Sequence, residues 1–542
     1  MFWSNNIGMG TYVSTDRGIP PRDNGLLIAA RGGGGALAGM ACSRLLALLL
    51  QIVIARQFGV TFLGYYVTGL ILCRILQVVA GLGLPIGSVR FMVHAMTTGS
   101  RRSMWLVYWW AISGVFVAGG ALGLLLYSSA PFLCTRIFGD QELLPVLRLF
   151  FIAVPWFAML RLLAEMSRSF GTVRYTVLVE DILFFLVQLG VLLFARFWST
   201  GPMVLIQGFL AAAFFCASLL GFIVYRQLRD YPVIESNQVA TDATVSVREL
   251  FAYSIPLMPT GVIFMTCNNI DMLMLNILCG GEAVGLYAAA TRWTLLVDSM
   301  SVPLMAIFRP LIAGALSREN REALQSLLMA AARWSLYLAL PCAAFLAVAA
   351  QPALGFFLKE GTAPSHASML LWILLVGSLS NPVGNGAGLL LSMGGQQYRD
   401  LVSLACGAFL NVLFNVLLIP KFGVLGAALA TGAGFYLTTA LRLVSVWRKW
   451  RMTPWSMGMR IPLVVFCCML FAGFILDTTV SAPSQIACGG VAACAVAWSI
   501  FTFGLEHDDS YVLKRLPRVI IIFINLLDEL NSRLFGCRKK FD

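Results

Sequence analysis

Three arginines lie inside long apolar segments of the chain. Arg44 and Arg74 fall near the middle of the first two apolar runs, and Arg292 falls about a third of the way along the eighth. A charge at such a depth in a membrane costs about 2.5 to 3.5 kcal/mol on insertion scales and marks a functional site by default. The guanidinium group stays ionised and offers a planar fork of donors that matches phosphate oxygens. The three side chains therefore predict a binding site for an anionic, phosphate-bearing group, with an interhelical salt bridge or a bond to a backbone carbonyl as the alternative.

Carboxylates inside the apolar runs suggest a second kind of chemistry, the binding of a coupling proton or Na⁺. The four candidates are Asp271, Asp298, Glu180 and Asp181. Ion pairing is the alternative explanation for most of them. In a helical hairpin Asp271 reaches nearly the same depth as Arg292, and the two could pair. Glu180 could pair with Arg161 or Arg174, and both alternatives stay open from the sequence.

Membrane-spanning helices must position these charges, because 59% of the 542 residues are hydrophobic and only 12% are charged. A soluble domain has about 25% charged residues. The apolar residues form runs of about 20, the length of an α-helix that crosses a bilayer. The expected fold is an all-α polytopic membrane protein with about fourteen transmembrane helices, over residues 33–57, 62–86, 104–128, 146–167, 175–197, 202–225, 250–279, 283–308, 327–350, 367–393, 400–419, 423–446, 461–478 and 485–504.

Prolines inside two of these spans are candidate hinges. Pro256 and Pro259 lie in the seventh span, and Pro382 lies in the tenth between Asn381 and Asn385. Proline frees a backbone carbonyl and lets a helix bend. Each proline could therefore serve a moving joint or a static kink.

The loops between the spans predict the orientation of the chain. If both termini are cytoplasmic, fifteen Lys and Arg residues fall in the inner loops and five in the outer loops and their edges. This bias is typical of cytoplasmic loops, and it accounts for the net charge of +13 without nucleic-acid binding. We expect a multi-pass protein of the bacterial inner membrane that contacts membrane lipids and no nucleic acid.

A short repeat divides the chain into halves. Residues 58–66 and 279–287 each place glycines and a final tyrosine at matching positions, with an offset of 221 (280 minus 59) between their first glycines. Six intervening spans would leave the halves related by a two-fold axis along the membrane normal. The expected organisation is a flexible cytoplasmic tail (1–32), a six-helix bundle (33–225), a cytoplasmic linker (226–248), a second six-helix bundle (249–447), two additional helices (448–504) and a cytoplasmic amphipathic tail (505–542).

The sequence does not contain the residue patterns expected of an enzyme or of a metal site. The thirteen cysteines include no Cys-x-x-Cys pair and read as small packing residues. The three histidines fall in loops or at span ends, which disfavours a membrane-embedded acyltransferase or polysaccharide polymerase, and no Walker motif is present. We therefore expect no enzyme, no metal and no cofactor, with H⁺, Na⁺ or the membrane potential as the energy source.

At two stretches the chain resembles a known family. The runs Tyr253–Pro259, Asn269–Leu275 and Gly285–Ala290 look like the opening of the second half of Wzx-type polysaccharide transporters, and Asn411–Ala428 resembles a later part of it. The resemblance extends over about residues 33–450. It implies the multidrug/oligosaccharidyl-lipid/polysaccharide exporter fold, in which two six-helix bundles face a central cavity and work by alternating access. The similar lipid II flippase also has fourteen helices, and this similarity implies intramembrane arginines on corresponding helices.

The resemblance implies a flippase for undecaprenyl pyrophosphate-linked oligosaccharides that serves exopolysaccharide, capsule or O-antigen synthesis. Its partners would be this lipid-linked substrate and the polysaccharide polymerase and export machinery. The alternative is a cation-coupled multidrug exporter of the same superfamily. An exporter of cationic drugs would need an apolar or acidic site, whereas the charges in mid-membrane here lean to arginine. The cationic residues therefore favour an anionic cargo.

Overall fold

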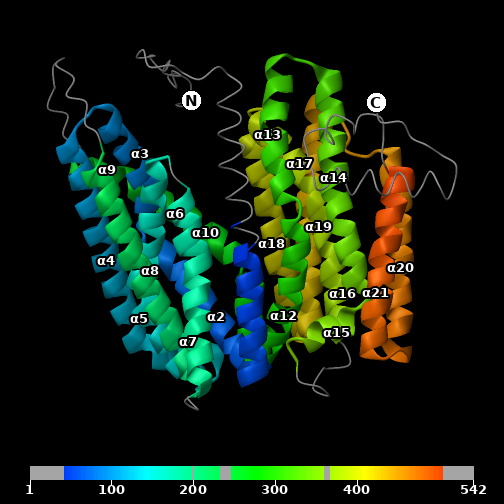
Figure 1. Cartoon of the computed structure of the whole chain (residues 1–542), viewed down its shortest axis with the longest axis horizontal. Coiled ribbons are helices and arrows are strands. Elements are labelled where there is room, and N and C mark those ends of the chain that lie inside the picture. The colour runs from blue at the N-terminus through cyan, green and yellow to red at the C-terminus, as the bar shows by residue number, and fades with distance from the viewer. Residues whose placement is uncertain are drawn as a thin grey trace.

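The computed structural model describes residue 39 and residues 42–171, 173–197, 201–231, 246–358 and 367–504. Within these residues every regular element is a helix (Figure 1). The predicted tails 1–32 and 505–542 and most of the predicted linker 226–248 lie outside the described residues. The all-α polytopic fold predicted from the apolar runs is confirmed.

Twelve of the described helices are long and apolar enough to cross a membrane, and the bent pair α12 and α13 raises this number to thirteen. They match thirteen of the predicted spans. The remaining prediction, 33–57, lies partly outside the described residues, and the segment 42–58 is helical. The predicted count of fourteen is therefore an approximate one.

The first bundle lies on one side of the molecule in Figure 1. After the segment 42–58 it contains α2 (Val60–Ala80), α3 (Leu84–Thr97), α4 (Arg101–Phe132), α5 (Leu143–Ser169), α6 (Arg174–Thr176), α7 (Phe184–Phe197) and α8 (Met203–Arg229). An aromatic cluster holds its core, with the ring of Phe209 4.9 Å from Phe150, 5.2 Å from Phe157 and 5.4 Å from Phe184. Aromatic rings at these separations add to the packing energy of the buried surface.

The second bundle lies beside the first. It contains α11 (Ile270–Cys279), α12 (Gly281–Ser299), α13 (Val302–Ser317), α14 (Arg321–Val348), α15 (Ala350–Gly355), α16 (Ala367–Ser378), α17 (Ser380–Met393), α18 (Gln397–Phe422) and α19 (Val424–Trp450). The two additional helices, α20 (Arg460–Thr479) and α21 (Ala482–Ser499), pack against α14 at the far side. Glycines allow this approach, because a side-chain carbon at Gly473 would overlap the carbonyl oxygen of Ala347.

The seventh predicted span is broken and joins the two bundles. It consists of α9 (Val247–Ser254), a 3₁₀ turn (Ile255–Leu257), α10 (Met258–Cys267) and α11. α9 packs on α3 and α4 of the first bundle, where the Ser254 hydroxyl would meet any side chain at Gly87. Pro256 lies in the 3₁₀ turn and Pro259 at the start of α10. The prolines thus coincide with a short 3₁₀ interruption between α9 and α10.

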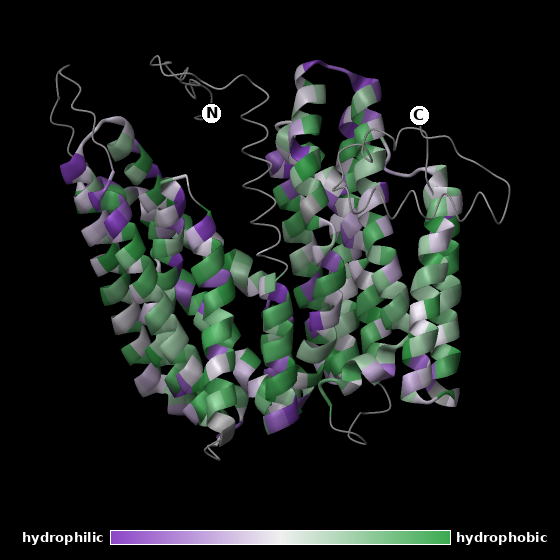
Figure 2. Ribbon diagram, in the orientation of Figure 1, coloured by the Kyte–Doolittle hydropathy of each residue, from purple (hydrophilic) through white to green (hydrophobic). Residues whose placement is uncertain are grey.

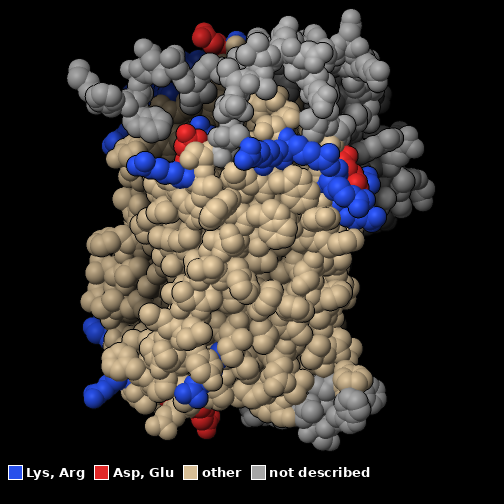
Figure 3. Space-filling model, turned by 90° about the vertical axis from the view of Figure 1, so that its left-hand side faces the viewer, with Lys and Arg blue, Asp and Glu red and all other residues tan. Residues whose placement is uncertain are grey.

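Polar residues gather at the two ends of the helices, and apolar residues cover their middle parts (Figure 2). Lys and Arg form a band at one end of the molecule, with few at the other (Figure 3). We call the first the basic end, and its exposed arginines include Arg101, Arg229, Arg321, Arg399 and Arg448. The other is the opposite end, where α2 and α12 begin. The loops that were assigned to one side of the membrane therefore share one end of the structure.

Candidate functional site

Two of the three predicted arginines meet at the junction of the bundles. Arg74 on α2 and Arg292 on α12 are half-buried and close enough for their charges to repel each other. Arg292 Nε donates to Gln51 Oε1 at 2.7 Å. Tyr66, two turns before Arg74 on α2, is buried, and its hydroxyl donates to Gln188 Oε1 at 2.9 Å. The neighbours of the arginine pair are therefore neutral.

No described carboxylate lies within ion-pair distance of Arg74 or Arg292. Removing a charge from water without a counter-charge is costly, and two adjacent like charges add mutual repulsion. A dianion placed against both guanidinium groups would relieve each cost through charge-assisted hydrogen bonds. The arrangement is thus suited to bind a group such as a pyrophosphate.

Arg44 lies apart from this pair. It is exposed on the segment 42–58, seven residues before Gln51, which corresponds to about 10 Å along a helix. Its charge is close enough to attract that of Asp298 on α12. The structure therefore brings Arg74 and Arg292 together and leaves Arg44 nearer to a carboxylate.

Asp271 does not pair with Arg292, so one of the two alternatives left open by the sequence is wrong. The side chain of Asp271 is only 9% exposed, and its Oδ2 accepts a bond of 2.8 Å from the Tyr287 hydroxyl. Thr431 Oγ1 lies 3.5 Å from the same oxygen. The reason is rotation: α11 turns Asp271 toward α19, while Arg292 reaches the segment 42–58.

Two asparagines that the sequence analysis did not single out extend this hydrogen-bond network beyond Thr431. Asn411 Nδ2 donates to Thr431 Oγ1 at 3.2 Å, and Asn415 Nδ2 donates to Asn411 Oδ1 at 2.6 Å. Asn415 Oδ1 is buried and accepts no hydrogen bond from the described residues. Their spacing of four residues within the apolar run 400–419 was the available signal, because it places both amides on one helix face.

Asp298 lies where two spans break. α12 ends at Ser299 and α13 begins at Val302, while α17 begins at Ser380 directly after α16. Asn381 Nδ2 approaches Asp298 Oδ2 at 3.4 Å, and Asp298 Oδ1 is buried without a hydrogen bond from the described residues. Pro382 follows in the first turn of α17, where its missing N–H is tolerated. Asp298, the break between α12 and α13 and the candidate hinge at Pro382 thus lie together.

Glu180 takes part in an ion-pair network near the basic end of the first bundle. Its Oε1 lies 3.0 Å from Arg161, and Arg161 and Arg168 lie 2.7 and 2.8 Å from Glu165. Asp181 is the next residue and is close enough to attract both arginines. Residues 177–183 form a π-helix, a distortion that often occurs at functional positions. The partner is therefore Arg161 and not Arg174, and ion pairing accounts for Glu180.

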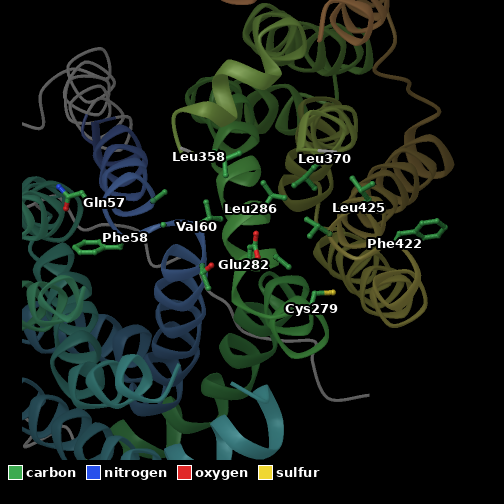
Figure 4. A pocket seen from close by; sticks show the side chains of 15 residues that line it. Gln57, Phe58, Val60, Cys279, Glu282, Leu286, Leu358, Leu370, Phe422 and Leu425 are labelled. Carbon is green, nitrogen blue, oxygen red and sulfur yellow. The ribbon is translucent and has the colours of Figure 1, made fainter. Parts of the chain in front are cut away.

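A cavity of about 580 Å³ lies at the opposite end, away from the arginine pair. Figure 4 shows Val60, Glu282 and Leu286 at its centre, with Leu370 and Leu425 across from them and Gln57 and Phe58 on the other side. Both bundles line it, so its shape depends on how they approach each other. Its lining is mainly apolar, which is unsuited to a pyrophosphate.

Two family models match long stretches of this chain. The model described as "Polysaccharide biosynthesis protein" matches residues 30–314, and the model described as "Lipid II flippase MurJ" matches residues 239–493. Among curated proteins, the chain is 23% identical over 384 residues to "Uncharacterized membrane protein YabM" of Bacillus subtilis (strain 168), an alignment that covers 69% of this chain and 68% of that protein.

Solved structures share the fold. The lipid II flippase MurJ in an inward closed conformation matches with a TM-score of 0.65 and 17% identity, over 85% of this chain and 96% of that chain. An inward-facing multidrug resistance transporter of the MATE family, in the MOP superfamily, matches with a TM-score of 0.59 and 14% identity, over 82% and 100%. At these identities the likeness concerns the arrangement of the helices and not the cargo.

Proposed function

This chain belongs to the polysaccharide biosynthesis protein family, and from that premise we propose that it moves undecaprenyl pyrophosphate-linked oligosaccharide units across the membrane by alternating access. The substrate would enter from the cytoplasmic leaflet and leave in the periplasmic leaflet. The product would then feed a polysaccharide polymerase and export machinery. The chain itself would bind and move the substrate without covalent chemistry.

The observation that carries this proposal is the pair of arginines that have no carboxylate partner among the described residues. Arg74 belongs to the first bundle and Arg292 to the second, so a dianion between them would contact both moving parts. Each charge-assisted hydrogen bond contributes about 1.5 to 3 kcal/mol. The free energy of substrate binding would therefore act directly on the relative position of the bundles.

Direction follows from the orientation proposed for the chain, with the basic end in the cytoplasm. An inside-negative potential favours the outward movement of an anion by about 2.3 kcal/mol per charge per 100 mV. This contribution supports export of a pyrophosphate headgroup. A cationic drug would gain the opposite contribution.

A coupling ion is proposed at Asp271. Thr431 Oγ1 lies 3.5 Å from Asp271 Oδ2, and a chain of hydrogen bonds leads from Thr431 through Asn411 to Asn415, whose buried Oδ1 has no hydrogen bond from the described residues. Such an unsatisfied oxygen leaves this polar network able to accept a further cation or proton. Na⁺ or H⁺ would supply positive charge to the buried carboxylate. Ion binding would tie α11, α18 and α19 of the second bundle together.

The test is a deletion strain complemented with the wild-type chain or with Arg74→Ala plus Arg292→Ala. We expect the deletion to accumulate undecaprenyl-linked oligosaccharide in the cytoplasmic leaflet, and the double variant to bind this lipid at least about 10-fold more weakly because two charge-assisted contacts are lost. Arg136→Ala is the control, since Arg136 is exposed at the opposite end. A normal leaflet distribution in the deletion strain would overturn the proposal and direct attention to drug export.

A further inference from the structure

The two copies of the sequence repeat lie against each other at the opposite end. In each copy, the glycine that separates two consecutive helices has a positive φ. Gly59 has φ 90° and ψ 165°, and Gly280 has φ 83° and ψ −179°. Glycine adopts such a conformation without a steric penalty. α2 begins at Val60 and α12 at Gly281, so the first residues keep the offset of 221 (281 minus 60). Equivalent turns therefore start equivalent helices.

The contact between these helices is self-complementary. A side-chain carbon at Gly64 would overlap the carbonyl oxygen of Gly281, and one at Gly285 would overlap the carbonyl oxygen of Val60. Val60 and Gly281 are equivalent in the repeat, as are Gly64 and Gly285. Each half thus presents the same two positions to the other, which is the geometry of a two-fold interface. The two backbones touch and leave no room for a side chain.

We infer that this contact is the seal that closes the opposite end of the carrier, and that glycine at positions 64 and 285 is required for closure. The inference rests on the proposed function only in that a carrier must open and close at this end. α2 packs in the first bundle and α12 in the second, so the contact breaks whenever the bundles separate there. Gly69 differs, because it packs on Phe150 within one bundle and has no part in opening.

Hydrogen bonds near the glycines strengthen the seal. Asn276 Nδ2 on α11 donates to Thr68 Oγ1 on α2 at 2.6 Å, and both side chains are 1% exposed. The ring of Tyr65 packs on Gly281, and its hydroxyl donates to Asp140 Oδ2 at 2.6 Å. The bond between Asn276 and Thr68 crosses from one bundle to the other, so it contributes to closure and is lost on opening.

The test measures opening without any substrate. Ala289→Cys places a reporter one turn after Gly285 on the same helix face, at a position that is fully buried in the closed state. In spheroplasts, a membrane-impermeant maleimide is added from outside, and labelling at residue 289 is measured by peptide mass spectrometry. We expect Gly64→Ala and Gly285→Ala each to raise this labelling at least about 5-fold, because the closed state no longer forms.

Two helical glycines with open space around them provide controls, namely Gly120→Ala and Gly314→Ala, which should leave the labelling unchanged. Thr68→Val keeps the side-chain shape and removes the hydrogen bond, so it should raise labelling about 2- to 3-fold even if the glycine variants fail to fold. If the glycine variants fold and residue 289 is labelled as in the wild type, the inference is overturned. If the glycine variants do not fold, wild-type labelling in Thr68→Val overturns it instead. A failure of flippase activity alone would not change this readout.

Discussion

At the scale of single residues, two groups of half-buried arginines can be distinguished: those paired with carboxylates, which hold helices together, and those of the proposed site, which have no carboxylate partner among the described residues. Arg161 has carboxylates at 2.7 and 3.0 Å, and ion pairs of this kind hold α5 against the π-helix at residues 177–183. Arg74 and Arg292 have neutral neighbours. Because an unpaired charge in a membrane is costly, a ligand that supplies the counter-charge would bind favourably there. The same reasoning applies to Asp271, which has hydrogen bonds and no cation.

The role proposed for Asp271 predicts the behaviour of Asp271→Asn. This variant keeps an oxygen for Tyr287 and loses the charge that would attract an ion, so stimulation of substrate movement by an imposed Na⁺ or pH gradient should fall by about 10-fold. The measurement is lipid translocation in proteoliposomes with each gradient in turn. Asp477→Asn is the control, because Asp477 lies on α20, away from Asp271, and accepts a hydrogen bond from Ser368 of α16. An unchanged gradient response would exclude Asp271 as the coupling residue.

At the scale of elements, two helix breaks of the second bundle lie next to each other. Asp298 and Ser301 occupy the break between α12 and α13, and Asn385 Nδ2 donates to Ser301 Oγ at 3.3 Å. Pro382 lies in the turn of α17 that follows the break after α16. Polar side chains from both breaks thus face each other and satisfy groups that the interrupted helices leave free.

Pro382→Ala distinguishes a hinge from a static kink, the two alternatives that the sequence left open. Alanine restores a backbone N–H that can bond the carbonyl of Ser378, so the joint between α16 and α17 should stiffen. If the joint moves in the cycle, translocation in the complemented deletion strain should fall by about 3- to 10-fold while the thermal unfolding temperature stays the same or rises. Unchanged translocation would identify a static kink.

Two bundles joined by a crossing helix define the whole molecule. α9 and α10 follow the linker but α9 packs on α3, so the seventh span ties the second half of the chain to the first bundle. The band of basic residues at one end gives the molecule a polarity relative to the membrane (Figure 3). The alternating access proposed above would therefore have to bend the seventh span, which contacts the first bundle and continues into the second.

The proposed orientation predicts which cysteines an external reagent reaches. Cys279 is exposed at the opposite end, so a membrane-impermeant maleimide should label it in spheroplasts. A second cysteine introduced as Gln397→Cys at the basic end should be labelled at least about 5-fold less until the membrane is permeabilised. Labelling of the second site and not of Cys279 would reverse the orientation.

The sequence by itself determined the helical spans, their approximate number, the repeat and the polarity of the loops. These features depend on local chemistry: a run of about 20 apolar residues partitions into the bilayer as a helix, and a glycine starts each repeat turn. The tertiary structure decided which charges meet. Gln51 and Arg292 are 241 residues apart in sequence, and Thr431 and Asp271 are 160 apart. Such contacts depend on the rotation and depth of each helix against its neighbours, and a shift of one residue turns a side chain by about 100°.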